Sequence, residues 1–178
     1  MLAPPGVTVR PTSDRAREAI FNILSHGELA AEGIPFADAA VLDAFAGTGA
    51  LGLEALSRGA AEAFFIERER DALVILRRNI EALDESSRAR IFPGDATRPP
   101  RPTAAAACAV VFLDPPYRSN LAAPALTALA ASGWFAPGAL AIVEIAVREA
   151  FTAPPGFILY DQRIYGAARL AFLRRGPH

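Results

Sequence analysis

The sequence has little cysteine, little histidine and almost no net charge. Its 178 residues include one cysteine, Cys108, and two histidines, His26 and His178. A single cysteine excludes an internal disulfide and a cysteine-rich metal site, so we expect no bound metal and treat Cys108 as ordinary core. The formal net charge of −1 gives no overall sign of a nucleic-acid-binding domain, because such domains are basic as a whole. Any contact with nucleic acid would need a local patch.

The sequence also lacks an apolar run near the roughly 18 residues that cross a bilayer. Its first residues have neither the charged start nor the apolar middle of a signal peptide. We therefore expect no membrane contact and a cytoplasmic location. Hydrophobic residues make up 52% of the chain, enough for a sizeable core. We expect one domain over residues 1–178, in which residues 1–11 form an N-terminal arm.

Short apolar runs alternate with helical stretches along the chain. The runs lie at residues 39–45, 62–67, 89–92, 108–114 and 139–145. Helices are predicted over residues 12–24, 50–58, 70–83 and 121–131. Apolar runs separated by helices predict buried parallel strands joined by crossovers. Two last runs, 156–165 and 168–174, are separated only by a turn and predict an antiparallel hairpin. The expected fold class is α/β, with a doubly wound, mostly parallel sheet.

The first strand end carries a glycine-rich loop, LDAFAGTGALG, at residues 42–52. Ligands of doubly wound sheets bind beyond the carboxyl ends of the strands. Gly47, Gly49 and Gly52 have the G-x-G-x-x-G spacing that lets backbone pass close to a ligand, although a plain tight turn gives the same spacing. Asp43 precedes the loop. Its carboxylate would repel a pyrophosphate but would suit an amino-acid ammonium group, or it could brace the loop as a hydrogen-bond acceptor.

Acidic residues also end the second and third runs. Glu67 directly follows buried-type residues, where a carboxylate can accept two hydrogen bonds from a ribose diol. Asp95, in FPGDAT, could bind an adenine amino group, and a turn aspartate is the alternative. With Asp43, these acids describe a pocket for a nucleoside attached to an amino acid, without a phosphate. S-adenosylmethionine meets that description.

The fourth strand end is Asp114-Pro115-Pro116-Tyr117. An exocyclic amine on a nucleobase is a poor nucleophile, because its lone pair is delocalised into the ring, and it needs acceptors aimed at its two hydrogens. The Asp114 carboxylate and the Pro115 carbonyl can supply them, since proline fixes the backbone and removes competing donors. Tyr117 can stack on the base, which is worth about 1–3 kcal/mol. A proline-rich turn without function is the alternative.

These segments together resemble a known family. D/N-P-P-Y/F after the fourth strand is the hallmark of S-adenosylmethionine-dependent amino-group methyltransferases. The fuller pattern is similar to the RsmD family, bacterial enzymes that methylate N2 of a guanine in small-subunit (16S) ribosomal RNA. Its segments here are RPTSDRAREAIFNIL, LDAFAGTGALGLEALSRGA, FIERE, GDA and VFLDPPY. The resemblance runs from about Arg10 to the C-terminus and implies a seven-stranded class I methyltransferase fold that uses S-adenosyl-L-methionine.

The resemblance also implies roles for particular residues. Cofactor contacts are implied for Asp43, Phe45, Ala46, Gly47, Gly49, Glu67, Arg68, Asp95, Ala96 and Asp114. The guanine amine would be held by the catalytic set Asp114, Pro115, Pro116 and Tyr117. RNA contacts are implied for Arg10, Thr12, Arg15, Tyr117 and Arg118. The implied partner is small-subunit ribosomal RNA within an assembled or assembling subunit, and nothing in the sequence requires more than a monomer.

One segment of the family pattern is absent from this sequence. Members usually begin with a basic strand segment of the R-I-I-x-G-x-x-R-G-R type before the R-P-T motif, and this chain starts after it. We expect either a true start further upstream or RNA docking through other arginines, such as Arg10, Arg15, Arg17 and Arg118.

Three other functions stay open from the residues alone. The first is another D-P-P-Y methyltransferase, acting on DNA, another RNA or a protein glutamine; glutamine enzymes tend to carry Asn in place of Asp114, and DNA enzymes usually add a target-recognition region. The second is a nicotinamide-dependent dehydrogenase that uses the glycine loop, which leaves Asp43 and the D-P-P-Y corner unexplained. The third is a non-catalytic ribosome-assembly factor.

Overall fold

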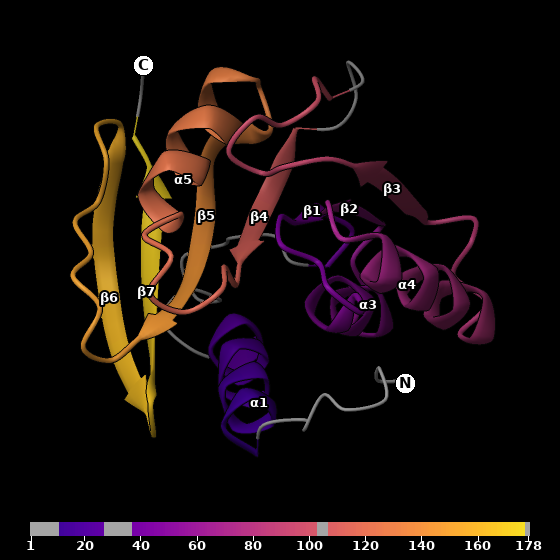
Figure 1. Cartoon of the computed structure of the whole chain (residues 1–178), viewed down its shortest axis with the longest axis horizontal. Coiled ribbons are helices and arrows are strands. Elements are labelled where there is room, and N and C mark those ends of the chain that lie inside the picture. The colour runs from indigo at the N-terminus through magenta and orange to yellow at the C-terminus, as the bar shows by residue number, and fades with distance from the viewer. Residues whose placement is uncertain (1–10, 27–36, 103–106, 177–178) are drawn as a thin grey trace.

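The computed structural model describes residues 11–26, 37–102 and 107–176, with side chains described from Arg15 onward. Strands from these residues form one seven-stranded sheet in the order β3-β2-β1-β4-β5-β7-β6 (Figure 1). The strands are β1 (Ala40–Asp43), β2 (Glu62–Glu67), β3 (Ala89–Pro93), β4 (Cys108–Leu113), β5 (Phe135–Ala146), β6 (Phe157–Tyr165) and β7 (Ala168–Arg175). The helices are α1 (Pro11–His26), α3 (Ala50–Ser57), α4 (Arg70–Ala82) and α5 (Ala122–Ala131).

Strand pairing follows the predicted pattern. β1 pairs in parallel with β2 and β4, β2 pairs with β3, and β4 pairs with β5. β7 pairs antiparallel with both β5 and β6, and the turn at Gly166 joins the hairpin. The predicted doubly wound sheet with a C-terminal antiparallel hairpin is therefore confirmed.

β5 is longer than its apolar run predicts. The run indicates a strand over residues 139–145, whereas β5 begins at Phe135. Gly138 adopts a φ of 71°, and the register with β4 shifts between Cys108 and Val110. Pro137 lacks the N–H that a ladder needs, and a proline inside a sheet is tolerated at such an irregularity. Pro137 therefore lies inside β5, although a proline usually marks the end of a strand or an edge strand.

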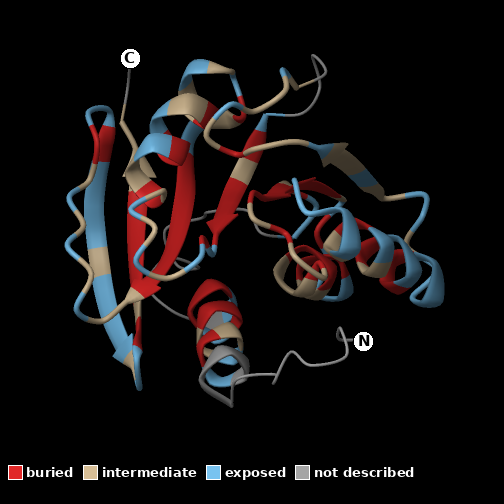
Figure 2. Cartoon of the chain, viewed as in Figure 1, coloured by how far each residue is buried: buried red, intermediate tan, exposed pale blue. Residues whose placement is uncertain are grey.

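Helices cover both faces of the sheet. α1, α3 and α4 pack on one face, where the rings of Phe21 and Phe112 lie 5.7 Å apart between centroids. α5 packs on the other face together with Trp134. Cys108 is fully buried in this second core, as predicted, and burial raises the pKa of its thiol. Figure 2 shows β4, β5 and β7 buried between the helices, whereas β6 at the edge is largely exposed. The centre of the sheet is therefore a packed support for the residues at its ends.

Candidate active site

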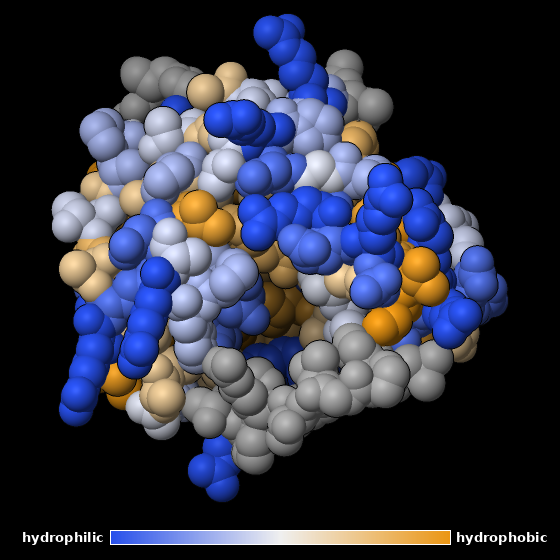
Figure 3. All heavy atoms as spheres, in the orientation of Figure 1, coloured by the Kyte–Doolittle hydropathy of each residue, from blue (hydrophilic) through white to orange (hydrophobic). Residues whose placement is uncertain are grey.

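The four acidic residues singled out in the sequence follow four neighbouring strands. Asp43 ends β1 and Glu67 ends β2, while Asp95 comes shortly after β3 and Asp114 directly after β4. The four strands are adjacent and parallel, so their carboxyl ends meet at one edge of the sheet. The fold therefore places the predicted residues at a common edge. Figure 3 shows the surface in the same view, with a recess that has hydrophobic atoms in its depth and hydrophilic side chains around it.

Asp43 is almost completely buried, with 1% of its surface exposed. Its Oδ2 accepts a hydrogen bond of 3.0 Å from the N–H of Gly52, so the bracing role that the sequence left open is present. Burial raises the pKa of Asp43 to about 7, and the Glu67 charge adds to the rise; the N–H groups of Gly52 and Leu51 oppose it. A cation beside this carboxyl would favour its charged form.

The three glycines of the loop have different surroundings. A Cβ on Gly49 would lie 2.4 Å from Cδ1 of Leu76, and a Cβ on Gly52 would lie 2.3 Å from Cε1 of Phe65. Both glycines are therefore required by the close packing of α3 and the loop against α4 and the sheet. Gly47, with a φ of 53°, has no atom within 4 Å of an added Cβ. Gly47 is thus the position with open space for a ligand beside the backbone.

Glu67 holds the glycine loop from the end of β2. Its Oε2 accepts a hydrogen bond of 2.7 Å from the N–H of Gly47. Its Oε1 accepts two more, each 2.7 Å, from the N–H groups of Arg68 and Glu69. A carboxylate offers about four acceptor positions, so Oε2 keeps one for a further donor. The predicted ribose contact is compatible with this arrangement, and the loop brace is an added role.

Asp95 forms a turn at the end of β3. Its Oδ1 accepts hydrogen bonds of 2.8 Å from both the N–H and the hydroxyl of Thr97, which lower the pKa of Asp95 despite partial desolvation. Its Oδ2 lies 3.7 Å from Nη1 of Arg68, a side chain that also bonds Glu69 at the surface. The turn-aspartate alternative is therefore present in the structure, and the adenine contact stays a prediction. Ala96, next in the chain, is buried.

The D-P-P-Y corner projects from the end of β4. Pro115 is buried, while the side chains of Asp114 and Pro116 are exposed. The N–H of Ser119 donates to the Pro116 carbonyl at 3.2 Å and closes a tight turn. The hydroxyl of Tyr117 donates a 2.8 Å hydrogen bond to Oε1 of Glu144. The buried proline and this bond fix the corner at both of its ends.

Sequence reasoning missed two residues that support these loops. Glu144 lies near the carboxyl end of β5, with 6% of its surface exposed, and accepts the hydrogen bond of the Tyr117 hydroxyl. Asn79 lies on the buried side of α4, and its side-chain amide donates to the carbonyl of Thr48 in the glycine loop at 2.9 Å. Each had a signal in the sequence, because each is a polar residue among apolar ones on a face that periodicity buries.

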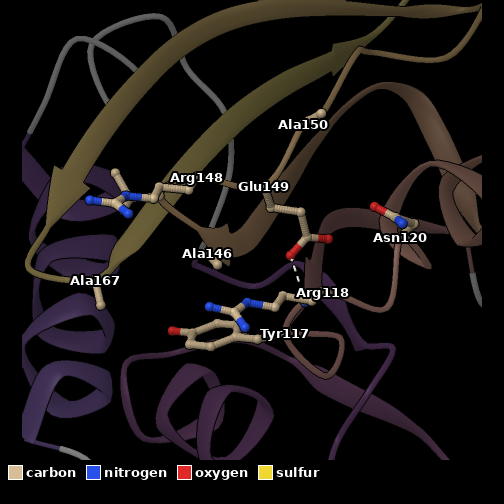
Figure 4. A pocket seen from close by; sticks show the side chains of 9 residues that line it. Tyr117, Arg118, Asn120, Ala146, Arg148, Glu149, Ala150 and Ala167 are labelled. Atoms are coloured by element: carbon tan, nitrogen blue, oxygen red, sulfur yellow. Dashed lines mark hydrogen bonds between the residues drawn. The ribbon is translucent and has the colours of Figure 1, made fainter.

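The residues predicted to contact RNA are only partly described. Arg10 lies outside the described residues, and of Thr12 only its place in the first turn of α1 is described. Arg15 is exposed on the same helix. Arg118 is exposed beside Tyr117, and the two residues help to line one pocket (Figure 4). Their contact with RNA stays a prediction.

The described residues contain no helix long and apolar enough to cross a membrane. They also contain no group of three or more histidine, cysteine, aspartate or glutamate side chains that could hold a metal ion. The candidate site therefore consists of the glycine loop, the strand-end carboxylates and the D-P-P-Y corner.

The strand order, the antiparallel β7 beside β5 and the site at the carboxyl edge define a class I S-adenosylmethionine-dependent methyltransferase fold. An RNA methyltransferase from Salinibacter ruber, solved in complex with S-adenosyl-L-homocysteine, shares this fold with a TM-score of 0.64 over 97% of this chain and 95% of that one, at 16% identity. Ribosomal RNA small subunit methyltransferase D of Escherichia coli K12 is 35% identical over 97% of this chain and 82% of its own length. The chain belongs to the ribosomal RNA small subunit methyltransferase D family.

Several comparisons support this family membership. The family model described as "Conserved hypothetical protein 95" matches residues 1–174. Ribosomal RNA small subunit methyltransferase D of Haemophilus influenzae is 33% identical over 89% of this chain and 79% of its own length. The solved structure of Escherichia coli yhhF superposes with a TM-score of 0.80 at 36% identity, covering 98% of this chain and 92% of that one.

Proposed function

We propose that the chain transfers a methyl group from S-adenosyl-L-methionine to the exocyclic N2 amine of a guanine in small-subunit (16S) ribosomal RNA. The observation that carries the proposal is the D-P-P-Y corner at the end of β4, beside the glycine loop that follows the adjacent strand β1. The names of its relatives support ribosomal RNA of the small subunit as the substrate. The proposal includes a single domain over residues 1–178, acting as a monomer in the cytoplasm on an assembled or assembling subunit.

The residues around the glycine loop fit S-adenosylmethionine. Open space beside Gly47 permits close approach to the backbone. The Asp43 carboxyl is buried next to the loop, where a cationic ligand would hold it ionised. Glu67 keeps an acceptor position for a ribose hydroxyl. Phe45, Ala46, Arg68 and Ala96 adjoin these positions in the chain and belong to the proposed contact set, together with Gly49, Asp95 and Asp114. When bound, the cofactor supplies an electrophilic methyl group on a sulfonium.

The D-P-P-Y corner would then prepare the amine for attack. A guanine turned out of its stack could place its N2 hydrogens against the Asp114 carboxylate and the Pro115 carbonyl. Both acceptors favour a pyramidal nitrogen whose lone pair faces the methyl group. As the nitrogen–carbon bond forms, the bond from the methyl carbon to sulfur would break and its electron pair would stay on sulfur, leaving a neutral thioether. The amine would lose a proton to Asp114, and this exposed carboxylate would return it to water. Tyr117 would stack on the base and hold it in line.

The decisive experiment is a labelling assay. Small ribosomal subunits that lack the modification are incubated with the protein and labelled S-adenosylmethionine, and the label is mapped to a nucleotide and an atom. Label on N2 of one guanine of the small-subunit RNA is expected. Label on DNA, on protein or on another RNA would instead support a different D-P-P-Y methyltransferase. Absence of all label would reject methyl transfer as the activity.

A further inference from the structure

A pocket of about 610 Å³ lies beside the D-P-P-Y corner. Its walls come from the turns that follow three strands (Figure 4). The lining residues are Tyr117, Arg118 and Asn120 after β4, Ala146, Val147, Arg148, Glu149 and Ala150 at the end of β5 and beyond it, and Ala167 before β7. Pockets of roughly 300–1,000 Å³ hold small organic ligands. This pocket is therefore large enough for a nucleotide.

The pocket is separate from the proposed reaction centre. Tyr117 belongs to both, but Asp114, Pro115 and the glycine-loop residues are not part of the lining. The sheet order explains the separation, because the loop follows β1 on one side of β4 and the pocket is formed beyond β5 and β7 on its other side. The guanine that is methylated must reach Asp114. The pocket is thus placed to receive a neighbouring part of the same RNA.

Two exposed arginines, Arg118 and Arg148, give the pocket groups that can bind an anion. The guanidinium groups of Arg118 and Arg148 make no hydrogen bond or ion pair within residues 11–26, 37–102 and 107–176, whereas Arg163 in β6 is paired with Asp161 at 2.8 Å. Arginine without an internal partner is well suited to bind a phosphate. The rest of the lining is mostly apolar, which suits the faces of a nucleobase.

The backbone of Arg118 is anchored across the pocket. Its φ is 60°, a left-handed conformation that is strained for a non-glycine residue. Its N–H donates a 2.8 Å hydrogen bond to Oε2 of Glu149 on the opposite wall, drawn as a dashed line in Figure 4. The turn that contains Glu149 is in turn held by Arg169, which donates to the Glu149 carbonyl. The two walls are therefore joined before any ligand binds.

We infer that this pocket binds a nucleotide adjacent to the target guanine in the same RNA strand, with its phosphates contacting Arg118 and Arg148. The inference rests on the proposed methyl transfer to ribosomal RNA, and it adds a binding site and a role for Arg148. Tyr117 separates the two positions, with the target base on the Asp114 side and the neighbouring nucleotide in the pocket. Binding the neighbour would hold the strand in the conformation in which the guanine is turned out.

Arg148→Ala tests this site, and Arg101→Ala is its matched control. Both side chains are exposed, so both variants remove one surface charge. Arg101 follows Pro100, whose carbonyl is bonded by Trp134 next to the amino end of β5, at the opposite edge of the sheet from the pocket. We expect Arg148→Ala to raise the KM for small subunits on the order of tenfold, as loss of one charged contact does. The slope of log kcat/KM against log salt concentration should become shallower by about one unit, because about one phosphate contact is lost.

Calorimetric binding of S-adenosylmethionine should be the same for the wild-type protein and both variants, which also shows that the variants are folded. A second measurement identifies the phosphates that the protein contacts. RNA with ethylated phosphates is reconstituted into subunits and offered to the protein as substrate, and the positions at which ethylation blocks methylation are determined. The wild-type protein should be blocked by ethylation immediately beside the target guanine, and Arg148→Ala should lose that sensitivity.

The outcomes separate the two proposals. If the wild-type protein methylates the subunit but Arg148→Ala behaves like Arg101→Ala, the pocket assignment is wrong and the function stands. Blocking phosphates far from the target guanine would show that the pocket holds a remote RNA segment, which also overturns the inference. If the wild-type protein labels no ribosomal RNA, the proposed function fails and the pocket assignment falls with it.

Discussion

The hydroxyl of Tyr117 donates a hydrogen bond of 2.8 Å to Oε1 of Glu144, a carboxylate buried within β5. The bond joins the D-P-P-Y corner after β4 to the neighbouring strand of the sheet. A tyrosine held at its hydroxyl loses less freedom when a base stacks on its ring. The pair therefore prepares the aromatic surface that the proposed substrate needs.

Removing either partner of this pair should impair RNA methylation and leave cofactor affinity unchanged. Tyr117→Phe keeps the ring and loses the bond, whereas Tyr117→Ala also loses stacking, worth about 1–3 kcal/mol. Glu144→Gln retains an acceptor and should remain closer to wild type than Glu144→Ala. Kinetics of Tyr117→Phe, Glu144→Ala and the double variant form a cycle, with an expected coupling of about 0.5–3 kcal/mol. Strictly additive losses would show that Glu144 does not act through Tyr117.

Asp114→Ala should bind S-adenosylmethionine normally and lose most of its turnover. The carboxylate is proposed to accept an amine hydrogen and then the proton, and such positioned acid–base groups contribute about 10²–10⁴-fold. Asp114→Asn keeps one acceptor oxygen but cannot take the proton, so it should fall between the wild-type protein and the alanine variant. Single-turnover methylation and calorimetry measure the two properties separately. A parallel loss of cofactor affinity and rate would mean that Asp114 has a different role.

Much of this site follows from the sequence because parallel strands end at a shared edge. Asp43, Glu67, Asp95 and Asp114 each follow an apolar run, and the run alone indicates the strand end. The role of Glu144 could not be predicted in this way, since its bond to Tyr117 spans 27 positions of the chain and depends on β5 lying next to β4.

The packing roles of Gly49 and Gly52 and the pocket beside Tyr117 could not be predicted from the sequence either. The spacing of Gly49 and Gly52 suggests a ligand, but the side chains that exclude a Cβ there belong to Leu76 and Phe65, on other elements. The pocket beside Tyr117 depends on three turns that only the folded sheet brings together.

Stability should depend on pH through Asp43. Its pKa is raised from 3.8 to about 7 in the folded protein, so between these values the folded state binds more protons than the unfolded state. Stability of the unliganded protein therefore falls as pH rises through this window. Asp43→Asn cannot ionise, and its Tm relative to wild type should be higher at pH 8 than at pH 5. Thermal unfolding of both proteins across this range makes the comparison, and a difference independent of pH would contradict a buried, titrating carboxyl.

The raised pKa of Asp43 also predicts how the affinity for the cofactor varies with pH. A sulfonium and an ammonium both favour the ionised carboxylate, so S-adenosylmethionine should bind more tightly as pH rises through about 7. Calorimetry at pH 6 and pH 8 measures this difference. The Asp43→Asn variant is the control, since its affinity should change little over the same range.

Alanine substitutions at Gly52 and Gly47 should have different effects on stability and on cofactor affinity. Gly52→Ala places a Cβ 2.3 Å from the Phe65 ring, and overpacking of this kind costs about 1–3 kcal/mol in the free energy of unfolding. Gly47→Ala meets no atom within 4 Å; its cost is backbone strain at positive φ, about 1–2 kcal/mol. Its methyl group, however, occupies the open space assigned to the cofactor, so affinity for S-adenosylmethionine should fall further than in Gly52→Ala. Urea unfolding and calorimetry on both variants test this order. If Gly47→Ala binds the cofactor as the wild-type protein does, the cofactor does not approach the loop at Gly47.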